Sequence, residues 1–261
     1  MEEKLMDLKI SGSSTMPGGK YDSVKISGSG KINGDVICSE FKVSGSGALR
    51  GSLETITGKV SGSASIQGNI KCGDFKFSGS ASVGGNLEGG NIHTSGSTKV
   101  EGRVKGKSLN VSGSMKIGEG IYVNDIDICG SLKSGGDCEG ERFISQGGFN
   151  IRGLLTADVI DIGLAGDCYA KEIGGEKIII KRVRNNGGFL RYILSLVNIN
   201  NGVLNTELIE GDYVEVNYTR CNIIRGKKVV VGKGSVIDKV EYTDEIIIEN
   251  GGVVKEEVKV Q

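Results

Sequence analysis

Six cysteines and one histidine are the side chains of this sequence most able to do nucleophilic or metal chemistry. The cysteines are Cys38, Cys72, Cys129, Cys138, Cys168 and Cys221. No two of them form a CxxC pair, and a closed zinc site needs four ligands held together. With His93 as the sole histidine, most schemes that use a histidine base rest on one residue. The sequence therefore predicts no catalytic residues, no metal site and no cofactor, and it argues against an enzyme.

The charges of the chain are balanced, with 32 basic and 32 acidic residues. A chain without net positive charge lacks the broad attraction by which proteins bind nucleic acid, so we expect no nucleic-acid partner. The N-terminal residues MEEKLM contain no apolar run, which predicts no signal peptide. No run of 18 apolar residues occurs, so no membrane-spanning helix is predicted. These features favour a cytoplasmic location and reduced cysteines.

A 17-residue repeat organises most of the sequence. Ser-Gly-Ser triplets recur with their glycines at Gly28, Gly45, Gly62, Gly79, Gly96 and Gly113. Altered triplets continue the series at Gly130 and Gly147. Such strict self-similarity is the signature of a solenoid built from stacked copies of one unit.

Within one repeat, side chains alternate as they do in a β-strand. Phe41 and Val43 are predicted to point inward, while Lys42 and Ser44 point outward. Glycines separate about three such short strands and suit corners because they accept positive φ. Seventeen residues match one turn of a coil whose parallel strands stack roughly 4.8 Å apart. The predicted fold is an all-β, right-handed parallel β-helix, with about 17 residues and three short strands per turn.

The same columns explain the residues that first suggested chemistry. Cys38 and Cys72 share an inward column with Thr55 but lie two turns apart, too far for a disulfide, so we interpret them as small core residues. His93 falls in an outward column of lysines, which predicts a surface position. Outward serines form two ladders that we expect to satisfy backbone groups at the corners. A hydroxyl face that binds a partner is the alternative.

The repeat becomes irregular beyond Ile160. Residues 166–173 resemble residues 136–143 after an interval of 30, which predicts a turn shortened by four residues. The predicted divisions are a main β-helix over 1–173, an insertion over 174–205 and further β-helical turns over 206–261. In the last part, Val229 and Val231 recur after 17 residues as Ile246 and Ile248.

The insertion combines basic and apolar side chains. Its residues of interest are Lys181, Arg182, Arg184, Phe189, Leu190, Arg191, Tyr192, Ile193 and Leu194. Such a segment could dock on an anionic membrane surface. Alternatively, its apolar side chains pack on the coil and close an exposed core, or they bind a protein partner.

The two ends of the coil are the predicted sites of self-assembly. An uncovered solenoid end presents unpaired strand edges and open core to another copy. The apolar residues that would line these ends are Leu5, Leu8, Ile10, Val253, Val254, Val258 and Val260.

The run KISGSGKINGDV at residues 25–36 resembles the signature of the bactofilin family, and VSGSASIQGNI at 60–70 repeats it. The resemblance implies a cytoplasmic, often membrane-associated protein that assembles without nucleotide into non-polar filaments by end-to-end stacking of β-helices. It also implies recruitment of other proteins, including cell-wall enzymes, in bacterial cell-shape or envelope processes. This chain is longer than a minimal bactofilin, carries an insertion and lacks proline-rich tails. The alternative is a non-polymerising β-helical rod that docks a protein partner or the inner membrane surface.

Overall fold

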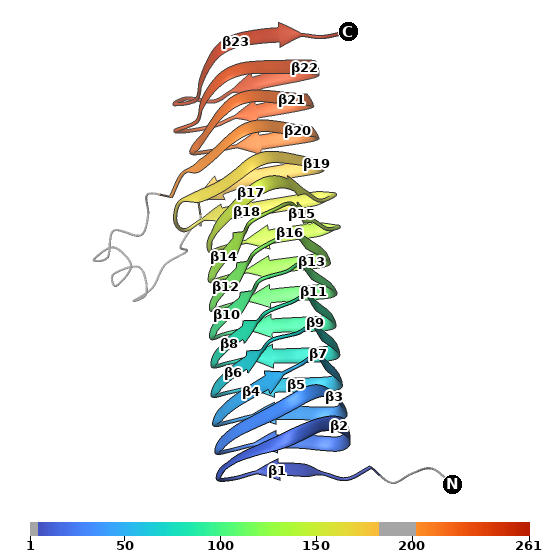
Figure 1. The fold of residues 1–261 in the computed structure, drawn as a ribbon. Helices are drawn as coiled ribbons and strands as arrows, with labels where there is room; N and C mark the ends of the chain where they lie inside the picture. The colour runs from blue at the N-terminus through green and yellow to red at the C-terminus, as the bar shows by residue number, and fades with distance from the viewer. Residues whose placement is uncertain (1–4, 183–201) are drawn as a thin grey trace, which may run out of the picture. The chain divides into compact units, whose positions relative to one another are not determined.

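The computed structural model describes residues 5–182 and 202–261, and every regular element in them is a β-strand. All strands pair in parallel, and they form about 14 turns of a β-solenoid (Figure 1). The predicted fold class is therefore confirmed. The chain divides into two compact units, Met1–Val123 and Asn124–Gln261.

The strands of unit 1 follow one another with short corners between them. They are β1 (Leu8–Ile10), β2 (Ser13–Ile26), β3 (Ser29–Val43), β4 (Ser46–Arg50), β5 (Leu53–Val60), β6 (Ser63–Ile66), β7 (Ile70–Phe77), β8 (Ser80–Val83), β9 (Leu87–Thr94), β10 (Ser97–Val100), β11 (Val104–Val111) and β12 (Ser114–Ile117). The boundary between the units falls within β13 (Ile121–Ile128).

Unit 2 begins with short strands and ends with long ones. They are β14 (Ser131–Ser134), β15 (Cys138–Glu139), β16 (Arg142–Ser145), β17 (Gly148–Thr156), β18 (Val159–Leu164), β19 (Cys168–Arg182), β20 (Leu204–Val216), β21 (Thr219–Val231), β22 (Val236–Ile248) and β23 (Val253–Lys259).

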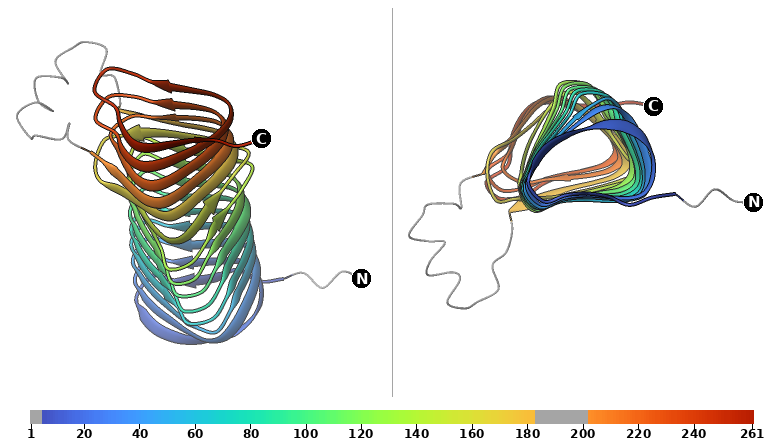
Figure 2. Two further views of the ribbon diagram at one scale, coloured as in Figure 1. Left: turned by 90° about the horizontal axis from the view of Figure 1, so that it is seen from above. Right: turned by 60° about the horizontal axis from the view of Figure 1, so that its bottom comes forward.

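Each turn of unit 1 has three faces, which give the turns the three-sided outline in Figure 2. We name them after one turn: face A contains residues 46–50, face B residues 53–55 and face C residues 57–60. From β3 onward, paired residues are 17 positions apart, as in Leu49 with Ile66 and Val60 with Phe77. The first turn is one residue shorter, since Leu8 pairs with Val24. Because the same residue types recur at the interval of the pairing, apolar side chains stack into continuous inward columns.

The core is thin and adjusts its volume from turn to turn. On face C the inward column contains Phe41, Gly58 and Phe75 in successive turns. A side chain on Gly58 would collide with the ring of Phe75, which leans into the space that the glycine leaves. Phe75 also stacks on Phe77, with ring centroids 4.4 Å apart. Large and small residues thus alternate to keep the column filled.

The corner between faces C and A is held by backbone hydrogen bonds. The Ser44 amide donates to the Ile26 carbonyl at 2.8 Å, and the Ser46 amide donates to the Gly28 carbonyl at 2.9 Å. A Cβ on Gly62 would collide with the Gly45 carbonyl oxygen, so the stacked backbones leave no room for one. The expectation that serine hydroxyls satisfy these corners holds for Ser27, whose hydroxyl donates to the Ile10 carbonyl at 3.4 Å. At the corner between Val43 and Ser46, the backbone groups of successive turns satisfy one another.

Side chains instead support the corner between faces A and B. Asp35 accepts a hydrogen bond from the Ser52 amide at 2.7 Å. The Ser52 hydroxyl then accepts from the Asn69 amide at 3.1 Å, and Asn69 accepts from the Asn86 amide at 2.8 Å. Asn86 continues the series by accepting from the Arg103 amide at 3.0 Å. This corner ladder satisfies donors that the sharp bend removes from the strand pairing.

The irregular part of unit 2 differs from expectation. Leu155 pairs with Ile173 and Ile160 pairs with Ile178, so the turn is lengthened by one residue or more. The prediction of a turn shortened by four residues is wrong, because the similarity of residues 136–143 to 166–173 does not correspond to the strand register. Strand β19 continues to Arg182, and Ile178 pairs with Val214 of β20, so the described coil continues on both sides of residues 183–201.

The predicted resumption of the repeat near the C-terminus is confirmed. Val229 pairs with Ile246, Val231 with Ile248, and Val236 with Val253.

Candidate functional site

Four of the cysteines are buried, whereas Cys72 is partly exposed and Cys129 is exposed. Cys38 and Cys72 lie on either side of Thr55 in one column, and all six thiols are free. Burial raises the pKa of Cys72 to about 12. His93 lies between Lys76 and Asn110 in its column. In the described ranges, no three His, Cys, Asp or Glu residues gather as metal ligands would.

A shallow trough of about 750 Å³ runs along face A of unit 1. Its floor is formed by small inward residues, among them Gly30, Gly47, Ala64 and Ala81. Because these side chains are small, this face lies closer to the core than a face with larger inward residues would. Outward serines line the trough, and Lys31 and Lys99 also border it. Apart from these two lysines, the trough is a surface of hydroxyls and small side chains.

A second groove, of about 440 Å³, lies on the side of unit 1 around face B. Its exposed apolar residues are Leu5, Ile37 and Ile56, with exposed fractions of 43%, 43% and 66%. An apolar residue at an outward position is the feature from which this groove could have been predicted.

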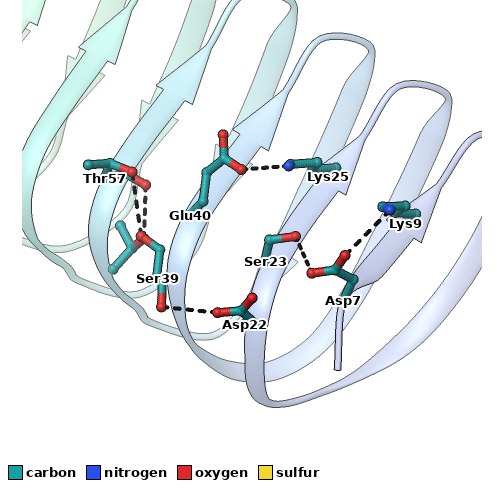
Figure 3. Close-up of polar contacts among 9 residues, drawn as sticks. Asp7, Lys9, Asp22, Ser23, Lys25, Ser39, Glu40 and Thr57 are labelled. Carbon is teal, nitrogen blue, oxygen red and sulfur yellow. Dashed lines mark hydrogen bonds and ion pairs between the residues drawn. The ribbon is translucent and has the colours of Figure 1, made fainter. Parts of the chain in front are cut away.

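The N-terminal edge of unit 1 is fastened by polar contacts (Figure 3). The Ser23 hydroxyl donates to Asp7 Oδ1 at 2.7 Å, and Lys9 Nζ lies 3.4 Å from the same carboxylate. These contacts lower the pKa of Asp7 from its usual value. In the neighbouring pair Lys25–Glu40, at 2.6 Å, an acidic residue offsets one charge of the lysine column. Of these contacts, the Ser23–Asp7 hydrogen bond joins the first strand region to the turn that follows.

The predicted assembly residues at this edge differ in exposure. Leu8 and Ile10 are 5% and 3% exposed, whereas Leu5 is in the side groove. The Tyr21 hydroxyl donates to the Pro17 carbonyl at 2.9 Å within β2. Proline at an edge also removes one donor that a neighbouring strand could use. Strand β1 is therefore the part of this edge best suited to pairing.

The C-terminal edge of unit 2 is more apolar and more open. The predicted residues Val253 and Val260 are 50% and 39% exposed, and Val254 and Val258 are partly exposed. Two residues that were not predicted as assembly residues, Ile246 and Ile248, show best that the core is open at this edge. Ile246 and Ile248 end two inward columns whose earlier members, Val229 and Val231, are fully buried. Ile248 is 41% exposed because the described residues place no strand over it.

One charged residue interrupts this apolar edge. Glu257 pairs with Val240, which pairs with Ile224, and both apolar residues are fully buried. Glu257 therefore stands at an inward position of the last turn, where a carboxylate opposes burial by another apolar surface. Sequence periodicity alone could not identify it, because the repeat length changes within unit 2.

The described part of the predicted insertion site is its first two residues. Lys181 pairs with Glu215 at 3.0 Å, and the Arg182 guanidinium lies 3.4 Å from the centre of the Tyr218 ring. Both side chains thus contact the coil. Arg184, Phe189, Leu190, Arg191, Tyr192, Ile193 and Leu194 lie outside the described residues. In the ranges that the structure covers, no apolar helix is long enough to span a bilayer.

The chain is similar in sequence to two known proteins, both of them uncharacterized. The chain is 39% identical over 94 residues to the uncharacterized protein YhbE of Bacillus subtilis (strain 168), and 32% identical over 108 residues to the uncharacterized protein YhbF of the same strain. These alignments cover 36% and 41% of this chain and 37% and 42% of the two relatives. No family model matches the chain, and no solved structure matches it.

Proposed function

We propose that this protein is a bactofilin-like structural scaffold that self-assembles, without nucleotide, by end-to-end stacking of its β-solenoids. The observation that carries the proposal is the C-terminal edge, where Ile246 and Ile248 end buried columns while their own strand edge is unpaired in the described chain. A second copy would bury these side chains and satisfy the free backbone groups.

The surfaces of the molecule support a scaffold more than an enzyme. The larger trough offers hydroxyls and small side chains but no set of residues that could transfer a proton or activate a nucleophile. A scaffold needs repeated, exposed side chains to which other proteins attach, and the outward columns supply them. We infer that the partners are further copies of the chain and cell-envelope proteins, at the cytoplasmic side of the membrane.

Sedimentation and electron microscopy of the purified protein without nucleotide test this proposal. We expect species that grow with protein concentration and elongated assemblies in the images. A strictly monomeric protein across a wide range of protein and salt concentrations would contradict it.

The second candidate is a non-polymerising coil that docks a protein partner or the membrane surface. The apolar groove at Leu5, Ile37 and Ile56 favours a protein partner, since exposed apolar clusters often mark interfaces. For the membrane, liposome co-sedimentation of the double variant Phe189→Ser, Ile193→Ser is the direct test. Binding equal to that of the unaltered protein would exclude this segment as the membrane contact.

A further inference from the structure

The corner before the last strand contains an Asn-Gly pair in a tight turn. Residues 249–252 connect β22 to β23, and the turn is closed by the Gly252 amide, which donates to the Glu249 carbonyl at 3.0 Å. Asn250 and Gly251 are the two central residues, and both are exposed. Gly251 has a φ of 91°, in the left-handed region that glycine adopts readily.

The backbone nitrogen of Gly251 has no acceptor. In the two preceding turns the residues at this position also have positive φ, and their amides point along the coil: the Tyr218 amide donates to the Lys233 carbonyl at 2.9 Å, and the Gly234 amide donates to the Gly251 carbonyl at 2.7 Å. Figure 1 shows β23 as the last strand of the coil. Within the described part of the chain, the Gly251 amide therefore donates to nothing. Because glycine has no Cβ, no side chain shields this nitrogen either.

We propose that Asn250 is a site of spontaneous deamidation, in which its side chain passes through a succinimide to aspartate or isoaspartate. The Gly251 nitrogen gives its proton to water or hydroxide and bonds to Cγ of Asn250, and the side-chain nitrogen leaves as ammonia. Water then adds to one of the two ring carbonyls and opens the ring. One water is consumed, one ammonia is released, and a neutral amide becomes a carboxylate. The reaction does not depend on the proposed self-assembly.

The other Asn-Gly pair with both residues described is held in regular structure. Asn33 and Gly34 lie within β3, and Asn33 pairs with residues of both β2 and β4. A Cβ on Gly18 or on Gly51 would collide with the backbone of Gly34, so this peptide unit is packed between two turns. Closing a succinimide requires that the peptide unit rotate toward the side chain, which such packing opposes. The same dipeptide is thus restrained at one corner and unrestrained at the other.

Formation of isoaspartate would change the last turn of the coil. Its extra methylene enters the main chain between the Glu249 carbonyl and the Gly252 amide, which the turn hydrogen bond now joins. This turn sets the register of β23 on β22, in which Val253 pairs with Val236. A longer main chain therefore loosens β23, whereas aspartate adds a charge and leaves the length of the main chain unchanged.

Peptide mapping by mass spectrometry tests the proposal on the full-length purified protein, kept dilute at neutral and at mildly alkaline pH. We expect the peptide with Asn250 to accumulate aspartate and isoaspartate, faster at the higher pH because the attacking nitrogen must lose its proton. Asn33 is the internal control in the same sample. It should react at least about tenfold more slowly, because its reaction requires local opening of the strands. In denaturant the two sites should react at similar rates.

Two variants separate the effect of charge from that of main-chain length. Asn250→Asp, measured when freshly purified, introduces the charge alone, and Asn250→Gln keeps an amide whose cyclisation needs a larger, less favourable ring. We expect hydrogen exchange across residues 253–259 to rise in the aged unaltered protein and to stay low in both variants. An equal rise in aged Asn250→Gln would overturn the link to β23. Equal rates at Asn250 and Asn33 in the native protein, or an Asn250 that keeps its amide, would overturn the proposed site.

Discussion

The corner ladder shows how single polar side chains support the coil. Asn69 accepts the Asn86 amide at 2.8 Å in place of a backbone carbonyl. Its neighbours in the ladder are Asp35, Ser52 and Asn86, so the position requires an acceptor rather than one residue type. This explains why the column looks variable in the sequence while its role is constant.

Replacing Asn69 with alanine should therefore destabilise the protein. The Asn86 amide would lose its partner at a partly exposed site, which costs roughly 0.5–1.5 kcal/mol in the free energy of unfolding. Denaturant unfolding monitored by circular dichroism measures the change. Asn69→Asp keeps the acceptor and should remain close to the unaltered protein; equal losses in both variants would contradict this role.

Thiol reactivity should follow burial. Cys129 is exposed, whereas burial raises the pKa of Cys72 to about 12 and that of Cys168 to about 11. Raised pKa values mean that little thiolate exists near pH 8, and the thiolate is the reactive form. We expect an alkylating reagent to modify Cys129 first in the native protein, as read by mass spectrometry. Modification of Cys138, which is fully buried, at a similar rate would contradict the described packing.

At the scale of one turn, glycine at the corner between faces C and A is a steric requirement. Gly45, Gly62 and Gly79 all have the carbonyl of the preceding turn where a Cβ would be. Gly12 has the same place in the first turn, but a Cβ there would meet nothing within 4 Å. Glycine is therefore sterically required at Gly45, Gly62 and Gly79, whereas at Gly12 in the same column there is room for a side chain.

Gly62→Ala and Gly12→Ala form a matched pair that separates these conditions. We expect Gly62→Ala to lower the free energy of unfolding by about 1–3 kcal/mol, because neighbouring backbones must shift. Gly12→Ala should change it by less than about 0.5 kcal/mol. Thermal and denaturant unfolding of both variants give the comparison, and similar losses would show that chain flexibility rather than stacking dominates.

Sequence periodicity was sufficient to predict the turns of unit 1, because each turn repeats the same glycines and apolar residues at one interval. It failed between β17 and β19, where local similarity suggested a register that the strand pairing does not follow. The outward serines that line the trough were predicted, but its hollow and the corner ladder were not, because both depend on which side chains face one another across turns. Glu257 was missed because turns of changing length hide its inward position.

At the scale of the whole molecule, the exposed ends of buried columns determine how copies would meet. Ile248 is 41% exposed at the C-terminal edge, and Ile37 is 43% exposed on the side of unit 1. The two residues have the same side chain and similar exposure but lie in different places. Substitutions at them therefore distinguish assembly through the C-terminal edge from non-specific hydrophobic association.

Ile248→Ser should weaken self-association, whereas Ile37→Ser should leave it unchanged. Because Ile248 is 41% exposed, its burial on association corresponds to about 0.6–1.2 kcal/mol, or roughly a three- to eightfold rise in the dissociation constant. Concentration-dependent sedimentation of both variants measures it, with thermal unfolding as a check on folding. Equal weakening by Ile37→Ser would locate assembly on the side groove instead.

The 17-residue register that unit 1 keeps from β3 onward also makes its length adjustable in fixed steps. Residues 64–80 span one interval, and their removal would join Ser63 to Ala81, the same junction that Ser80 makes now. Such a deletion leaves every column continuous and shortens the stack by one strand spacing. A protein built this way can serve as a molecular ruler, because gain or loss of whole repeats changes its reach without redesigning its surface or its ends.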